Sequence, residues 1–228
     1  MKTKWFQNAM WIMAGVVLFS SCQQDDTEKP IITLNGDKTM YVNLGDTWQD
    51  PGATANDNKD GNLTSQITVT GTVNTNQVGE YTLIYTVSDE AGNTATETRT
   101  VYVKADRLAG TYSVTASVTG PGQGIYDYTE NITASSVDYN KLIITNFSGY
   151  SNLVVNAFVS GPNISVDQTA TYDWDDDGTA TQATISTQSS TYEVTAASPA
   201  GCKIKKINYS INYGAAGTDV VAATYTKQ

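Results

Sequence analysis

Apolar and polar residues alternate with a period of two along much of this chain, and this alternation is what most constrains its fold. Every second residue is apolar in residues 81–87 and again in residues 207–213. Such a period places the apolar side chains on one face of a β-strand. After the first 21 residues no stretch shows the 3.6-residue period of an amphipathic helix, and turn residues separate the short strand signals. We therefore predict an all-β fold.

The first 21 residues have the composition of an export signal. Lys2 and Lys4 make a short basic start, and residues 9–19 (AMWIMAGVVLF) are apolar and uncharged. That length suits the apolar core of a signal peptide and is too short to span a bilayer comfortably. We therefore predict that residues 1–21 are a signal peptide and that the rest of the chain is exported.

Cys22 follows the two small residues Ser20 and Ser21. Small side chains before a cut suit a cleavage enzyme, and a thiol can be acylated. Residues 18–22 (LFSSC) resemble a bacterial lipobox, which implies a lipoprotein anchored to a membrane through Cys22. Phe19 departs from that pattern, where Leu is more usual. The alternative is an ordinary signal peptide followed by an incidental cysteine.

Residues 22–29 (CQQDDTEK) are polar and charged, which favours a flexible acidic tether. Asp25 and Asp26 lie where Bacteroidetes lipoproteins carry a short acidic export signal, and the segment is similar to that signal. The resemblance implies an outer-membrane lipoprotein that is exposed on the cell surface. A plain acidic linker is the alternative.

Charge and composition exclude several classes of function. Loss of Lys2 and Lys4 with the leader leaves 11 basic against 23 acidic residues, a formal net charge of −12. Such a surface repels nucleic acid, so we expect no nucleic-acid partner. The absence of histidine removes Ser–His–Asp and Cys–His catalysis and His-ligated zinc. If Cys22 is lipidated, Cys202 has no cysteine to pair with, and we expect a buried core thiol.

Residues 30–104 form the first predicted domain and carry a series of short motifs. In order these are residues 50–53 (DPGA), 57–61 (DNKDG), 79–81 (GEY), 85–89 (YTVSD), 92–93 (GN) and 99–103 (RTVYV). Together they resemble the bacterial surface immunoglobulin-like family, which implies a β-sandwich that acts as a spacer or adhesive module. The Cys…Trp…Cys arrangement of antibody domains is missing, so we expect packing alone to hold the core. The acidic turn at Asp57, Asp60 and Asn62 belongs to the family pattern, and we expect it to be structural.

Residues 105–228 form a second predicted all-β domain with about eight to ten strands, which suits an antiparallel barrel or a sandwich. Residues 146–147 (NF) and 155–168 (VNAFVSGPNISVDQ) resemble lipocalin-like C-terminal domains of Bacteroidetes surface lipoproteins. Those domains mostly lack a known function. The choice between a closed barrel and a sandwich stays open.

Aromatic residues are concentrated in this second domain, which holds ten of the fourteen tyrosines. Aromatic faces stack on the apolar faces of sugars, and side chains near turns are the ones that a β scaffold presents to ligands. The candidate ligand-binding residues are Tyr126, Tyr128, Tyr150, Tyr172 and Trp174. The alternative is that tyrosine simply suits half-buried strands.

Asp173, Asp175 and Asp177 alternate before Gly178, as in the first half of a calcium loop. The twelfth position of such a loop would be Thr184, where a bidentate Glu is expected. We therefore predict at most a weak calcium site and no other cofactor. The alternative is a solvated acidic hairpin turn.

The function we expect is non-catalytic. The second domain contains only two glutamates, Glu130 and Glu193, and neither lies in a motif for paired-carboxylate hydrolysis. We predict that this domain binds a glycan or another extracellular ligand while the first domain acts as a spacer. The alternatives are a protein-binding or adhesive subunit of a surface complex, and a carrier with an apolar lumen lined by Ile207, Tyr209 and Ile211.

Overall fold

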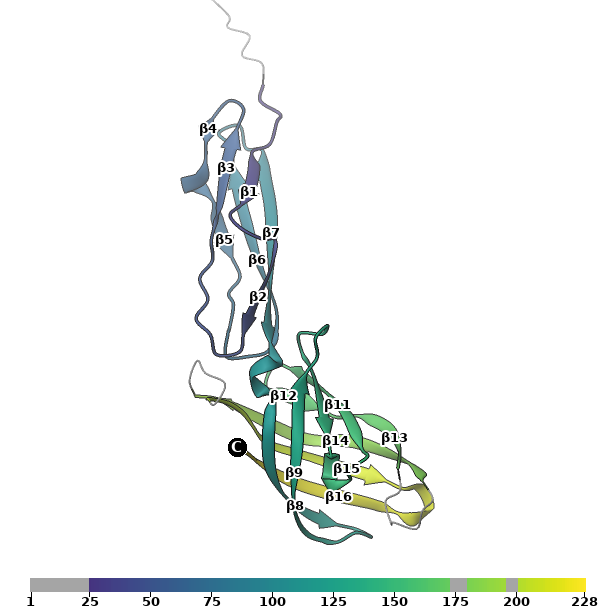
Figure 1. The fold of residues 1–228 in the computed structure, drawn as a ribbon. Coiled ribbons are helices and arrows are strands. Elements are labelled where there is room, and N and C mark those ends of the chain that lie inside the picture. The colour runs from purple at the N-terminus through teal and green to yellow at the C-terminus, as the bar shows by residue number, and fades with distance from the viewer. Residues whose placement is uncertain (1–24, 173–179, 196–200) are drawn as a thin grey trace, which may run out of the picture.

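The computed structural model describes residues 25–172, 180–195 and 201–228, and these residues form two β domains that lie end to end (Figure 1). This confirms the all-β prediction. The helical turns that it describes are short 3-10 turns: η1 (Thr64–Gln66), η2 (Ala105–Leu108), η3 (Phe147–Gly149) and η5 (Gly214–Ala216). Among the described residues, no helix has the length and apolar character needed to cross a membrane.

The first domain is an immunoglobulin-like sandwich of two sheets. One sheet has the order β1 (Ile31–Leu34), β3 (Ala53–Asp57), β4 (Gly61–Asn62). The other has the order β2 (Thr39–Asn43), β7 (Thr94–Lys104), β6 (Gly79–Ser88), β5 (Thr68–Thr70). Strands β2 and β7 pair in parallel, and the other pairs are antiparallel.

A buried charged network crosses the middle of this sandwich, which corrects the expectation that packing alone holds its core. Arg99 on β7 is fully buried and forms an ion pair with Asp50, which also accepts a hydrogen bond from the Tyr85 hydroxyl at 2.6 Å. The guanidinium also donates to the backbone oxygens of Asn35, at 2.5 Å, and Asp37, at 3.1 Å. A buried guanidinium is tolerated only with such partners. The DPGA and RTVYV motifs therefore meet in one network.

The second domain is a single nine-stranded antiparallel sheet that curls strongly, rather than two stacked sheets (Figure 1). Its order is β12 (Asn163–Ser165), β11 (Val154–Ser160), β10 (Lys141–Thr145), β9 (Gly124–Ala134), β8 (Gly110–Thr119), β16 (Thr218–Lys227), β15 (Cys202–Asn212), β14 (Thr181–Val194), β13 (Gln168–Tyr172).

The two edges of this curled sheet meet at one place. Strands β12 and β13 are opposite edges, yet the chain reaches Gln168 from Ser165 in three peptide steps, which span at most about 11 Å. Beside this link the Ile164 N–H donates to the Ser190 Oγ at 2.6 Å, from β12 to β14. The sheet must therefore bend back on itself, which creates its hollow interior face.

One apolar core continues from the first domain into the second. Leu44 and Val103 of the sandwich belong to the same buried cluster as Tyr112 and Ile204 of the curled sheet. Cys202 is fully buried in this cluster, and its thiol donates to the backbone oxygen of Leu44 at 3.4 Å. The prediction that Cys202 is a core thiol is therefore confirmed.

Hydrogen bonds also join the two domains at this junction. Val78 and Gly161 form an isolated antiparallel bridge between the domains. The Tyr192 hydroxyl accepts a hydrogen bond from the Val78 N–H at 3.2 Å and donates to the Gly161 oxygen at 2.6 Å. Each of these backbone groups would lose a partner if that hydroxyl were removed.

We predict that Tyr192→Phe lowers the free energy of unfolding by about 1–3 kcal/mol, because it removes a hydroxyl that bonds two backbone groups at the junction. Urea unfolding followed by circular dichroism measures this change. The exposed Tyr41 offers a control, and Tyr41→Phe should leave stability within about 0.5 kcal/mol. Equal stability of both variants would show that the Tyr192 contact contributes nothing.

Candidate functional site

A cavity of about 830 Å³ opens at one end of the curled sheet. Strand β15 begins at Cys202 in the domain junction and ends at Asn212, beside the cavity residues Ile211 and Tyr213. The cavity therefore lies at the end of the second domain that is remote from the first. In a β fold, such an end is where loops present ligand-binding side chains.

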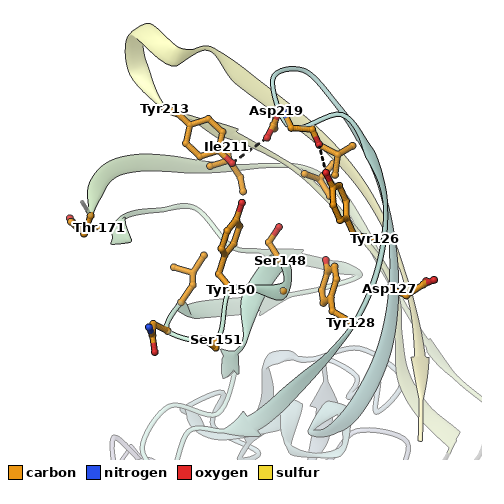
Figure 2. Close-up of a pocket in the computed structure, with 17 residues that line it drawn as sticks. Tyr126, Asp127, Tyr128, Ser148, Tyr150, Ser151, Thr171, Ile211, Tyr213 and Asp219 are labelled. Atoms are coloured by element: carbon orange, nitrogen blue, oxygen red, sulfur yellow. Dashed lines mark hydrogen bonds between the residues drawn. The ribbon is translucent and has the colours of Figure 1, made fainter. Parts of the chain in front are cut away.

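Tyrosine rings surround this cavity (Figure 2). Tyr126 and Tyr128 lie two residues apart on β9, so strand geometry places them on the same face. Tyr150 follows η3 and stands between them and Tyr213, which follows β15. The structure thus brings together three of the residues chosen from the sequence, although their role in binding remains a prediction.

The floor of the cavity is apolar and its rim is polar. Val118, Leu153, Ile211 and Val221 contribute apolar lining, and Leu153, Ile211 and Val221 are buried. The polar lining residues other than tyrosine are Asp127, Ser148, Ser151, Asn152, Thr171 and Asp219. A cavity with this composition suits a ligand that has both apolar faces and hydroxyl groups.

Asp219 connects two turns at the rim of the cavity through hydrogen bonds. It is 6% exposed, and its two oxygens accept hydrogen bonds from the Gly122 N–H at 2.8 Å and from the Tyr213 hydroxyl at 3.2 Å. The Tyr126 hydroxyl in turn donates to the Gly122 oxygen at 3.0 Å. A Cβ atom at Gly122 would lie 2.7 Å from the Asp219 Oδ2, so any other residue there would displace this carboxylate from its hydrogen bonds. The network fixes Tyr126 and Tyr213 on facing walls.

Glu130 lies below the cavity and is fully buried. Its Oε1 accepts a hydrogen bond at 3.0 Å from the N–H of Ser148, a lining residue with a left-handed φ of 57°. Non-glycine residues rarely adopt this conformation, and a surrounding contact must hold it. Glu130 is therefore a positioning residue for the turn that leads to Tyr150.

Burial raises the pKa of Glu130 to about 8, against the opposing effect of the Ser148 N–H. In the unfolded chain the pKa lies near 4.5, so the folded protein holds the proton more tightly. Stability should therefore fall as the pH rises from about 4.5 to about 8.

We predict that Glu130→Gln removes most of this loss of stability with rising pH. At pH 9 the variant should be more stable than the wild type by about 2–4 kcal/mol, whereas at pH 5 the two should agree within about 1 kcal/mol. Denaturant unfolding across this pH range provides the measurement. Glu193→Gln is the matched control, because Glu193 is partly exposed and pairs with Lys205. A wild-type profile identical to that of Glu130→Gln would contradict the assignment.

Several residues chosen from the sequence lie outside the described part of the chain. These are Cys22, Asp173, Trp174, Asp175 and Asp177. Their lipidation, aromatic and calcium roles remain predictions.

The chain on either side of Trp174 is described. Tyr172 ends strand β13 and pairs with Thr181 on β14. Thr171 and Ala180 both line the cavity.

Sequence reasoning missed Tyr213 and Asp219, as well as a second aromatic group at the junction. There the rings of Tyr41 and Tyr102 stack at 5.4 Å, and Tyr102 and Tyr139 lie at 4.7 Å. The three rings, which we call the aromatic ladder, line a smaller hollow of about 280 Å³. Because they come from β2, β7 and the turn before β10, only the fold brings them together.

Glycoside hydrolysis by paired carboxylates would require two such groups in the main cavity. The two described acidic residues that line this cavity are Asp127 and Asp219. Asp127 points away from the cavity and accepts a hydrogen bond from Thr115, while Asp219 is held by Gly122 and Tyr213 (Figure 2). Among the described lining residues, no pair of carboxylates converges on a common point as glycoside hydrolysis requires.

Comparison with known proteins identifies the first domain. Residues 32–103 match the family described as bacterial surface protein, Ig-like domain. The resemblance drawn from the motifs is therefore confirmed, and this domain is of a kind found on bacterial surface proteins. No curated protein matches the chain by sequence.

Two solved structures resemble the chain distantly. One is a lipoprotein from Bacteroides thetaiotaomicron, with 20% identity, 86% of this chain and 99% of that chain covered, and a TM-score of 0.34. The other holds CBM51-2 in complex with GlcNAc and INT domains from Clostridium perfringens ZmpB, with 17% identity and a TM-score of 0.28. This second match covers 87% of this chain and 44% of that one. At such TM-scores neither likeness carries an argument about a ligand or an activity.

Proposed function

We propose that this chain is a cell-surface lipoprotein whose second domain binds a glycan in the tyrosine-lined cavity. The observation that carries the proposal is the convergence of Tyr126, Tyr128, Tyr150 and Tyr213 around one apolar-floored cavity of about 830 Å³. Tyrosine rings offer flat apolar faces to the C–H faces of a sugar, and polar rim groups hydrogen-bond its hydroxyls.

Packing inside the curled sheet favours a sugar over an acyl chain. Ile207 and Tyr209 are fully buried, and the Tyr209 ring packs 4.6 Å from that of Phe147. Of the three residues expected to line an apolar lumen, only Ile211 lines the cavity. Side chains therefore fill the deeper interior, and a short ligand at the open end suits the shape better than a long chain.

The first domain then acts as a spacer at the cell surface. Its family is named for bacterial surface proteins, and its junction with the second domain holds the cavity at the far end of the molecule. We propose that a lipid on Cys22 and an export signal at Asp25 and Asp26 anchor the chain in the outer membrane, on the tether that precedes the first domain. We propose that the protein has no catalytic activity and does not bind nucleic acid.

A second candidate function is adhesion through the aromatic ladder. Tyr41 is 62% exposed at the junction, and Glu80 and Asp138 flank the hollow beside it. Exposed aromatic residues are enriched in protein–protein interfaces. If adhesion is the function, the chain should bind a protein partner and no small ligand.

A glycan array tests the leading proposal, using residues 23–228 so that both domains and the tether are present. We predict binding that Tyr150→Ala and Tyr126→Ala each weaken by at least about tenfold, because truncating an aromatic residue that dominates binding costs about 2 kcal/mol or more. Phe158→Ala is the matched control, since Phe158 is an exposed aromatic residue that does not line the cavity.

Two results would contradict the proposal. One is a well-folded wild type that binds no glycan. The other is a Tyr150→Ala variant that binds as tightly as Phe158→Ala. If Tyr41→Ala alone abolished capture of a surface protein, the adhesive function would take its place.

A further inference from the structure

Three carboxylates from distant parts of the sequence meet at the tip of the first domain. Asp26 belongs to the tether, Asp57 ends β3, and Asp89 follows β6. One oxygen from each lies within 4.8 Å of the others. Because β6 starts next to the junction residue Val78 and runs to Ser88, this acidic tip is the end of the domain that is remote from the junction (Figure 1).

Backbone geometry holds two of these carboxylates in place. The Asp57 Oδ2 accepts hydrogen bonds from the Lys59 N–H at 2.8 Å and the Asp60 N–H at 3.0 Å. The Asp89 Oδ1 accepts the Asn93 N–H at 2.7 Å. The Asn93 side-chain amide also donates to the Asp89 Oδ2 at 2.8 Å and to the backbone oxygen of Asp26 at 3.1 Å.

One oxygen within this group lacks the partner that its burial demands. Asp57 is only 3% exposed, and its Oδ1 is buried without a hydrogen-bond partner among the described residues. A buried carboxylate oxygen with no donor, beside two further carboxylates, calls for a cation.

We propose that Asp26, Asp57 and Asp89 bind a calcium ion at this tip. The ligands are all hard oxygens, which favour Ca²⁺ over Zn²⁺. Calcium–oxygen distances of about 2.4 Å let one ion join oxygens up to about 4.8 Å apart, which is the spacing that the three oxygens satisfy. Backbone oxygens and water complete its coordination.

The ion joins the tether to the first domain. Asp26 lies four residues after Cys22, a distance of at most about 14 Å even in a fully extended chain. If Cys22 carries the proposed lipid, calcium therefore holds the tip of the sandwich close to the membrane surface. The metal site itself does not depend on the proposed glycan-binding function or on the lipid.

Calorimetric titration of residues 23–228 with CaCl₂ tests the site. We expect binding in the range of extracellular calcium modules, about 0.1–1 mM, together with a rise in Tm. Asp57→Asn should weaken binding at least tenfold or abolish it. Asp26→Asn should do the same, and because Asp26 lies in the tether before the first strand, its loss leaves the sandwich folded. Glu90→Gln is the matched control, since it removes an exposed charge from the same tip but none of the three ligands.

Four outcomes would overturn the proposal. One is a wild type that gives no calcium signal at several millimolar. Another is that Asp26→Asn and Asp57→Asn bind calcium as tightly as Glu90→Gln does. Binding lost only in Asp175→Asn would place the ion in the second domain. An equal response to MgCl₂ alone would remove the assignment to calcium. The glycan array is an independent experiment, so a negative calcium result would not contradict the proposed glycan-binding function.

Discussion

The apolar core shared by the two domains is the interaction on which the rest of the structure depends. A sandwich of this size buries a modest fraction of its surface and has no disulfide within it. Leu44 and Val78 extend its core into the second domain, where the backbone oxygen of Leu44 meets the thiol of Cys202 and Val78 pairs with Gly161. Within the sandwich, the ion pair and hydrogen bonds of Arg99 join β7 to the segments that follow β1 and precede β3. The junction joins the domains end to end (Figure 1). The residues of the tyrosine-lined cavity and of the acidic tip therefore belong to opposite ends of the molecule.

The strands were predictable from the sequence, but their arrangement was not. Period-two alternation marks which residues share a face, so the all-β class and most strands follow from it directly. Between the alternating segments, the structure has a 3-10 turn ending at Gln66 and a short strand, Thr68–Thr70. The curl of the second domain depends on β12 and β13 being opposite edges of one sheet. No local pattern encodes that order.

The residues of the candidate site also fall into two groups: those that the local sequence predicts and those that only the fold brings together. Tyr126, Tyr128 and Tyr150 were identified because each lies near a turn, which is local information. Tyr213 and Asp219 come from a hairpin far along the chain, and only the sheet order places them opposite Tyr126.

Burial of charged groups was harder to foresee. Glu130 follows Tyr128 and precedes Ile132 at a spacing of two, a signal that it points inward. Asp57 was assigned to a structural turn, and its hydrogen bonds from Lys59 and Asp60 agree with that role. Its proximity to Asp26 and Asp89 is a tertiary contact that the sequence does not show.

A crystal structure of the chain with a bound glycan from the array tests the central claim most directly. We expect a sugar ring stacked on Tyr126, Tyr128 or Tyr150, with its hydroxyl groups near the polar rim. A sugar bound instead at the aromatic ladder of Tyr41 and Tyr102, with the cavity empty, would contradict it.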